Sequence, residues 1–169
     1  MNTVTLKGNK IKIADGFPLV GDAARPFTLV TSDLKEVSLA DYAGKKIVLN
    51  IFPSIDTGVC ALQLETFSKK IDKMEEVVLM TASKDLPFAM KRFCASEGLE
   101  TIINASDFRY NDFASQYNVE MTNGPLKGLF ARVVLVLDKD NNITYKEEVD
   151  DITHEPNYDA AKAAVEAIG

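Results

Sequence analysis

The sequence predicts an α/β fold in which a mixed central sheet is flanked by helices. Two observations predict it. Apolar runs of strand length alternate along the chain with segments whose apolar residues recur at helical spacing, and the chain opens with a hairpin pattern. At 169 residues the chain fits one domain, 1–169, which is long enough to bury a core without disulfides or a metal.

The opening residues predict an N-terminal hairpin, 3–14. Residues 3–7 and 10–14 alternate apolar and polar side chains around Gly8 and Asn9, a pair typical of tight turns. The segment 32–44 is rich in turn residues. Further strands are expected, from short apolar or β-branched runs, at 27–30, 46–52, 77–82, 101–104, 129–138 and 143–149.

Helices are expected at 57–72, 88–96, 108–117 and 157–168. The apolar residues that define the first of them are Val59, Leu62, Phe67 and Ile71. Asp85 is a candidate N-cap for the second helix, and Gly98 is placed to end it.

Composition and charge exclude several classes of function. The net charge is −6, and Lys and Arg are scattered, so a phosphate backbone would be repelled and nucleic-acid binding is not expected. No apolar run reaches the roughly 18 residues that span a bilayer, so no membrane segment is expected. The first residues lack the pattern of a secretory signal, so we expect a cytoplasmic protein, in a compartment that keeps thiols reduced.

Cys60 stands where a thiol is hard to keep inert. Pro53 ends the apolar strand, because proline cannot donate to the ladder, and Asp56 or Thr57 can cap the helix that follows. Cys60 then falls in the first helical turn, where free amides and the helix dipole favour an anion and lower the pKa of a thiol. The alternative is a small buried residue that packs the helix against the sheet.

The segment PSIDTGVC contains the pattern Pro-x-x-x-Thr-x-x-Cys, and on this motif the chain resembles the peroxiredoxins. It is most similar to their bacterial thiol peroxidase subgroup, the atypical two-cysteine enzymes. The resemblance extends over nearly the whole chain, through the opening hairpin and the segments LNIFPSIDTGVC, DLPFAMKRFC, GPLKGLFARVV and VDDITHEPNYDAA.

The resemblance implies a thioredoxin-like fold with an N-terminal hairpin extension. It also implies reduction of hydroperoxides to water or alcohols, with electrons from thioredoxin. By motif position, Cys60 matches the peroxidatic cysteine and Cys94 the resolving cysteine, which pair as a redox disulfide. Thr57 matches the threonine that bonds the sulfur, Pro53 the proline that shields the site, and Arg132 the arginine that stabilises thiolate and peroxide.

Read from the residues alone, two of these positions have alternatives. Arg132 interrupts an apolar run, and it could lie on the solvent side of an edge strand or in a structural ion pair. Cys94 could be a buried cysteine on a helix face. It follows Cys60 by 94 − 60 = 34 positions, which excludes a CxxC pair, and disulfide formation would need local unfolding if the two helices hold the thiols apart.

Two other functions compete with the peroxidase. A thiol–disulfide oxidoreductase would share the fold, but Thr57 stands where such enzymes carry the first cysteine of CxxC. A redox-sensing binding protein would need a partner segment that the sequence does not indicate. We expect no cofactor and no metal site. The resemblance also implies a homodimer, and apolar residues near the site favour organic hydroperoxides as substrates.

Overall fold

A computed structural model describes residues 3–71, 74–99 and 101–168. The strands are β1 (Thr3–Leu6), β2 (Asn9–Lys12), β3 (Leu29–Thr31), β4 (Glu36–Val37), β5 (Lys46–Ile51), β6 (Val77–Ser83), β7 (Ile103–Ser106), β8 (Val133–Leu137) and β9 (Ile143–Glu148). The helices are α1 (Gly58–Ile71), α2 (Pro87–Glu97), α3 (Asp112–Tyr117) and α4 (Tyr158–Glu166), with a 3₁₀ turn η1 at Leu39–Tyr42.

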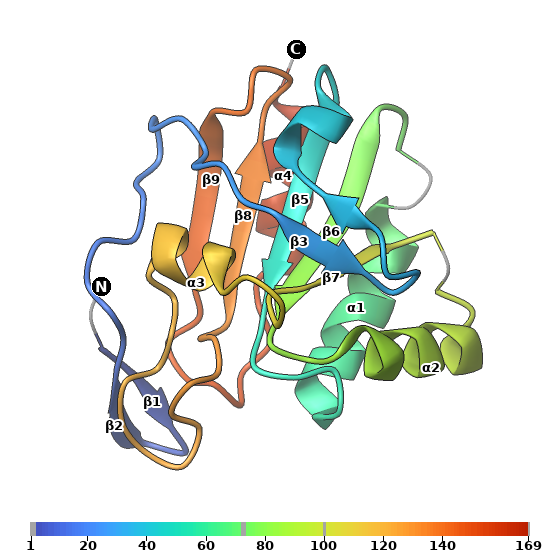
Figure 1. The fold of residues 1–169 in the computed structure, drawn as a ribbon. Coiled ribbons are helices and arrows are strands. Elements are labelled where there is room, and N and C mark those ends of the chain that lie inside the picture. The colour runs from blue at the N-terminus through green and yellow to red at the C-terminus, as the bar shows by residue number, and fades with distance from the viewer. Residues whose placement is uncertain (1–2, 72–73, 100, 169) are drawn as a thin grey trace.

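The central sheet has the strand order β4-β3-β7-β6-β5-β8-β9. Strands β5, β6 and β7 run parallel, whereas β3, β8 and β9 each pair antiparallel with a neighbour, so the sheet is mixed as predicted. Strands β1 and β2 form a separate hairpin at one end of the molecule (Figure 1). The expected α/β class and the N-terminal hairpin are therefore confirmed.

Each face of the sheet carries its own apolar cluster. Val48 on β5 and Phe52 just after it pack in the cluster with α1, α2 and α4. Ile47, Leu49 and Ile51 on β5 pack in the cluster with α3 and the hairpin. Figure 1 shows α3 on the opposite side of the sheet from α1 and α4. Because strand side chains alternate, every second residue of the central strands faces the helices that carry the two cysteines.

Several predicted boundaries move. The hairpin turn is at Lys7 and Gly8, both with positive φ, and not at Gly8 and Asn9. The strands expected at 27–30 and 101–104 begin later, and the turn-rich segment 32–44 contains β4 and η1. The strand expected at 129–138 is β8, which begins only at Val133. The chain before it pairs elsewhere, because the Ala131 amide donates to the Val119 carbonyl outside the sheet.

Two helix predictions need correction. The helix expected at 108–117 begins at Asp112, because the Asp107 carboxylate accepts from the Phe113 and Ala114 amides and caps α3 there. On α1, Leu62 is 45% exposed, so it does not belong to the buried stripe with Phe67 and Ile71. The residues that α1 buries are Cys60, Gln63, Leu64, Phe67, Ser68 and Ile71.

Among the described residues, no helix combines the length and the apolar character that a bilayer crossing requires. That the whole chain folds as one domain stays a prediction, and a single cooperative unfolding transition would support it.

Candidate active site

Cys60 lies in the first turn of α1, directly after the loop that leaves β5. Its side chain is fully buried, in the apolar cluster that also contains Phe52 and Ile55. The sequence left two interpretations of Cys60, a buried packing residue and a thiol at a helix start. The structure shows both features together, because this thiol is buried and also lies in the first helical turn.

Arg132 lies just before β8 and is 1% exposed, so a permanent positive charge is held inside the protein. Its Nη1 donates to Cys60 Sγ at 3.2 Å and to Gln63 Oε1 at 2.8 Å. Its Nε and Nη2 donate to the Ile152 carbonyl at 3.2 and 2.8 Å. The strand that follows Arg132 lies between β5 and β9, so the edge-strand alternative is wrong.

The oxygen atoms that accept from Arg132 belong to neutral carbonyl groups, the Gln63 amide and the Ile152 backbone. These acceptors satisfy N–H groups of Arg132 inside the protein and are themselves uncharged. The same guanidinium group therefore contacts the Cys60 sulfur and two neutral oxygen acceptors at once.

Gln63 and Asn50 extend this network and were missed by the sequence analysis. Gln63 is fully buried one turn after Cys60, and its Nε2 donates to Asn50 Oδ1 on β5 at 3.0 Å. With its amide fixed at both ends, Gln63 holds the guanidinium of Arg132 against the sulfur. The signal that could have found it is a polar residue three positions after Cys60, on the same helix face.

The loop before α1 carries Pro53 and Thr57. Pro53 is buried two residues after the end of β5, and its role of shielding the site stays a prediction. Thr57 is exposed, and its hydroxyl donates to the Ser54 carbonyl at 3.0 Å. Because that hydroxyl has one proton, a bond to the Cys60 sulfur requires its rotation, and this role of Thr57 stays a prediction. The expected side-chain cap is replaced by the Ser54 contact, and the Asp56 carboxylate binds Arg92 at 2.7 Å.

Asp85 organises the same loop from the end of β6. One carboxylate oxygen accepts from the Ser54 hydroxyl at 2.6 Å, and the other accepts from the Ile55 amide at 2.7 Å and the Ser83 hydroxyl at 2.8 Å. The predicted cap role of Asp85 is wrong, because the N-cap of α2 is Leu86. Its carboxylate is instead used to tie the loop before Cys60 to the chain that leads into α2.

The hairpin supports the site from the other side. Thr5 donates its amide to the Asp150 carbonyl at 2.9 Å and accepts from the Ile152 amide at 2.8 Å, which fixes the carbonyl that Arg132 uses. The Asp151 carboxylate accepts from Thr5, Gly8 and Thr153. Burial alone would raise the pKa of Asp151, but these hydrogen bonds hold it below its usual range.

Cys94 lies on α2, away from this network. It shares the apolar cluster with Cys60 and is 7% exposed, but its sulfur accepts from Asn104 Nδ2 on β7 at 2.7 Å. The two cysteines are not joined in a disulfide. The structure therefore brings Cys60 and Arg132 together directly, with Pro53 and Thr57 on the adjoining loop, and leaves Cys94 on a separate helix.

Within the described ranges, no group of three or more His, Cys, Asp or Glu side chains is arranged to hold a metal ion. The groups that the site presents are a buried cysteine, a guanidinium and side-chain amides. Such donors suit a reaction in which negative charge develops on sulfur or on a departing oxygen.

Comparison with known proteins decides the family. Residues 19–162 match the Redoxin family, and a thiol peroxidase of Leptospira interrogans is 46% identical over 169 residues, with 99% of each chain covered. The chain belongs to the redoxin family. A solved peroxiredoxin-like protein from Aquifex aeolicus superposes with a TM-score of 0.93 at 38% identity, covering 98% of this chain and 96% of that one.

A thiol peroxidase from Chromobacterium violaceum, at 22% identity, shares the fold of this redoxin with a TM-score of 0.90 over 97% of this chain and 95% of that one. These relatives confirm the resemblance to the thiol peroxidase subgroup of the peroxiredoxins and the thioredoxin-like fold class. They also confirm the expected enzyme class, a thiol-dependent peroxidase among the oxidoreductases. The roles of individual residues are not decided by these comparisons.

Proposed function

We propose that this redoxin reduces hydroperoxides through Cys60, resolves the product with Cys94 and is recycled by thioredoxin. The observation that carries the proposal is the contact of 3.2 Å between Arg132 Nη1 and the sulfur of a buried cysteine in the first turn of a helix. The family membership supports the peroxide as the oxidant.

The Cys60 thiolate attacks one oxygen of the hydroperoxide, and the O–O bond breaks. The departing oxygen takes a proton and leaves as water or alcohol, while Cys60 becomes a sulfenic acid. Arg132 stabilises the negative charge as it moves from sulfur to the departing oxygen. Thr57, once its hydroxyl turns from Ser54, adds a second donor, and Pro53 limits access of water to the sulfur.

The sulfenic acid then condenses with the Cys94 thiol, which forms the Cys60–Cys94 disulfide and releases water. A disulfide needs Cα atoms within about 7 Å, and Cys94 sits on a different helix, bound to Asn104. We therefore expect local unfolding of α2 or of the start of α1 on oxidation. Equal hydrogen-exchange protection of both helices in reduced and oxidised protein would contradict this step.

Thioredoxin restores the dithiol by exchange, with two electrons transferred for each hydroperoxide. This recycling fits a reducing compartment, and we propose the cytoplasm as the location. Apolar residues around Cys60, such as Phe52 and Ile55, support organic hydroperoxides as preferred substrates. A steady-state comparison of cumene hydroperoxide with hydrogen peroxide tests this preference, and a higher kcat/KM for hydrogen peroxide would reverse it.

Peroxide consumption with a thioredoxin system tests the cycle. We expect wild-type protein to turn over, Cys60→Ser to consume no peroxide, and Cys94→Ser to react with peroxide without cycling through thioredoxin. Stoichiometric oxidation of the wild type without turnover would favour a redox sensor over an enzyme. Turnover of a disulfide substrate without peroxide consumption would favour a thiol–disulfide oxidoreductase.

We also propose that the protein is a homodimer. Exposed apolar side chains gather around a hollow of about 250 Å³ at the start of α2, where Phe88 and Phe108 are each 66% exposed beside Leu34 and Leu86. Contiguous exposed apolar surface is typical of an interface, and a second copy of the chain fits the subgroup. Phe88 and Met90 are both apolar residues of α2, but Phe88 is exposed and Met90 is buried. They therefore do not form one apolar face of the helix. Phe88→Glu should yield monomers in sedimentation velocity, whereas an unchanged sedimentation coefficient would exclude this surface.

A further inference from the structure

We propose that Asn104 is a positioning residue that holds Cys94 in the reduced protein and thereby sets the rate of disulfide formation. The inference rests on the proposed function, because it concerns the step that follows oxidation of Cys60. It adds a residue that neither the motif nor the comparisons indicate.

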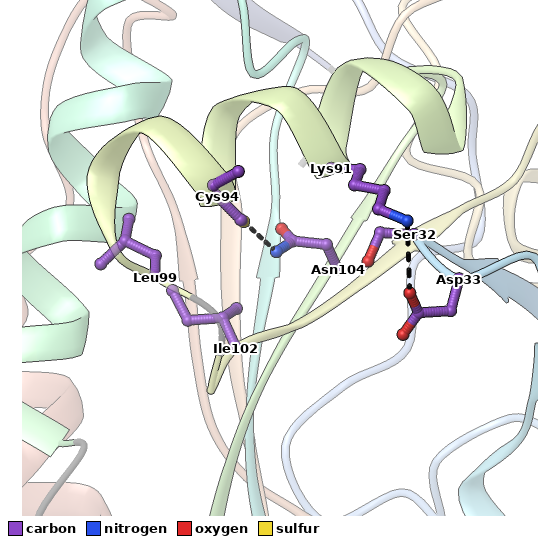
Figure 2. A pocket seen from close by; sticks show the side chains of 8 residues that line it. Ser32, Asp33, Lys91, Cys94, Leu99, Ile102 and Asn104 are labelled. Atoms are coloured by element: carbon purple, nitrogen blue, oxygen red, sulfur yellow. Dashed lines mark hydrogen bonds and ion pairs between the residues drawn. The ribbon is translucent and has the colours of Figure 1, made fainter.

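Asn104 reaches Cys94 from beneath α2. It lies on β7, is 3% exposed, and donates through Nδ2 to the Cys94 sulfur at 2.7 Å. Figure 2 shows its amide directed from the strand toward the sulfur on the helix above. Because β7 lies inside the central sheet, between β3 and β6, this hydrogen bond joins α2 to the sheet.

Thr81 fixes the orientation of that amide. Its hydroxyl donates to Asn104 Oδ1 at 3.0 Å, and Thr81 and Asn104 are register partners on neighbouring parallel strands. With Oδ1 accepting from Thr81, the amide turns its N–H groups toward Cys94. Thr81 is itself the register partner of Asn50, so a buried polar row crosses the sheet from the Cys60 network to the Cys94 contact.

The packing around Cys94 makes this contact matter. A pocket of about 390 Å³ that opens to solvent adjoins the helix, lined by Lys91, Cys94 and Ala95 from α2 and by Asn104 from the sheet (Figure 2). Because solvent occupies this open pocket, fewer protein contacts hold this part of α2 than hold a helix inside a filled core. A hydrogen bond to the sulfur then contributes a larger share of what keeps Cys94 in place.

The Cys60 sulfenic acid can react in two ways, and the contact between Asn104 and Cys94 influences which reaction is faster. For the disulfide to form, Cys94 must leave Asn104, and the condensation with the sulfenic acid releases water. While Cys94 stays bound to Asn104, a second hydroperoxide can oxidise the sulfenic acid to sulfinic acid and leave as alcohol or water. A stronger hold on Cys94 therefore slows the disulfide and favours the sulfinic acid.

The test compares Asn104→Leu with wild type after rapid mixing with hydrogen peroxide, acid quench and mass spectrometry of the intact chain. We expect disulfide formation to be about fivefold faster in the variant, as for the loss of one hydrogen bond, with less sulfinic acid at excess peroxide. The rate of the first oxidation of Cys60 should stay within twofold of wild type. Ser96→Ala removes a hydroxyl on the same helix that bonds only within it, and should leave all three quantities unchanged.

A second measurement does not depend on peroxide chemistry. In a Cys60→Ser background, Asn104→Leu should raise the rate of Cys94 alkylation by iodoacetamide about fivefold, and the near-isosteric Thr81→Val should raise it less. Unchanged or slower alkylation in both variants would overturn the inference, as would unchanged or slower disulfide formation. If wild-type Cys60 gave no sulfenic acid, the proposed function would fail while the alkylation result still judged the role of Asn104.

Discussion

The surroundings of Cys60 and of Cys94 are built differently. Cys60 lies in a fully buried network in which Arg132 is held by Gln63 and by the Ile152 carbonyl, with support from α1, the approach to β8 and the C-terminal segment. Cys94 is held on α2 by a neutral amide, beside an open pocket. One sulfur contacts a buried charge, and the other accepts from a neutral amide beside a pocket.

This difference follows from the two tasks that we propose. Attack on a hydroperoxide needs donors that are already in place when charge moves, so rigidity favours the first step. Disulfide formation needs a thiol to travel, so a low local stability of its helix favours the second step.

The largest effect is expected from Arg132→Lys. Lysine keeps the charge but cannot donate to Cys60, Gln63 and Ile152 together, so the sulfur loses its oriented donor. We expect the second-order rate constant of Cys60 oxidation to fall about 100-fold, measured by rapid quench and mass spectrometry. Arg92→Lys, at an exposed arginine, is the matched control. A loss of less than threefold at Arg132 would remove the contrast between the two regions.

Asp85→Ala should act next most strongly. It leaves the Ser54 hydroxyl, the Ile55 amide and the Ser83 hydroxyl without their acceptor, so the loop before Cys60 loosens. We expect the free energy of unfolding to fall by about 2 kcal/mol and Cys60 oxidation to slow about tenfold. Urea unfolding and rapid quench measure the two effects. Lower stability with an unchanged oxidation rate would show that Asp85 supports the fold and not the site.

Asp151 makes the hairpin contribution depend on pH. Its folded-state pKa is lowered, so its contribution to stability is complete above the unfolded value of about 4 and is lost as the pH falls below it. We expect Asp151→Asn to be less stable than wild type at pH 7, with a difference that shrinks between pH 5 and pH 3. Urea unfolding at these pH values checks it, with Asp140→Asn on an exposed turn as control. A difference that is constant with pH would exclude this role of the carboxylate.

The smallest effect is expected from the ion pair that joins the two regions. Arg92 on α2 binds Asp56 before α1 at 2.7 Å, but both side chains are largely exposed. Exposed pairs contribute between about 0 and 1 kcal/mol, so Arg92→Ala should change the free energy of unfolding by less than about 1 kcal/mol. Disulfide formation should change less than twofold, with little dependence on salt. A tenfold change in the rate of disulfide formation would mean that this ion pair, and not Asn104, mainly determines how readily Cys94 leaves its position on α2.

Much of the fold follows from local patterns. The apolar run before Pro53, the helix that begins near Cys60 and the Gly98 end of α2 are recorded in neighbouring residues, because burial imposes a period of two on strands and of 3.6 on helices. The errors occurred where a distant group intervened. Asp107 delays the start of α3, and pairing of 129–131 with 119–121 delays β8.

By itself, the sequence was enough to predict the α/β class, the place of Cys60 in the first turn of a helix and, through resemblance, its contact with Arg132. The tertiary structure alone decided what holds each sulfur. Arg132 reaches Cys60 across 72 positions, and Asp85 reaches Ile55 across 30, because the packing of helices onto the sheet selects which polar groups meet. Gln63 and Asn104 look like ordinary polar residues in the sequence. Their roles arise only when burial removes water and leaves each N–H or C=O to find a partner inside the protein.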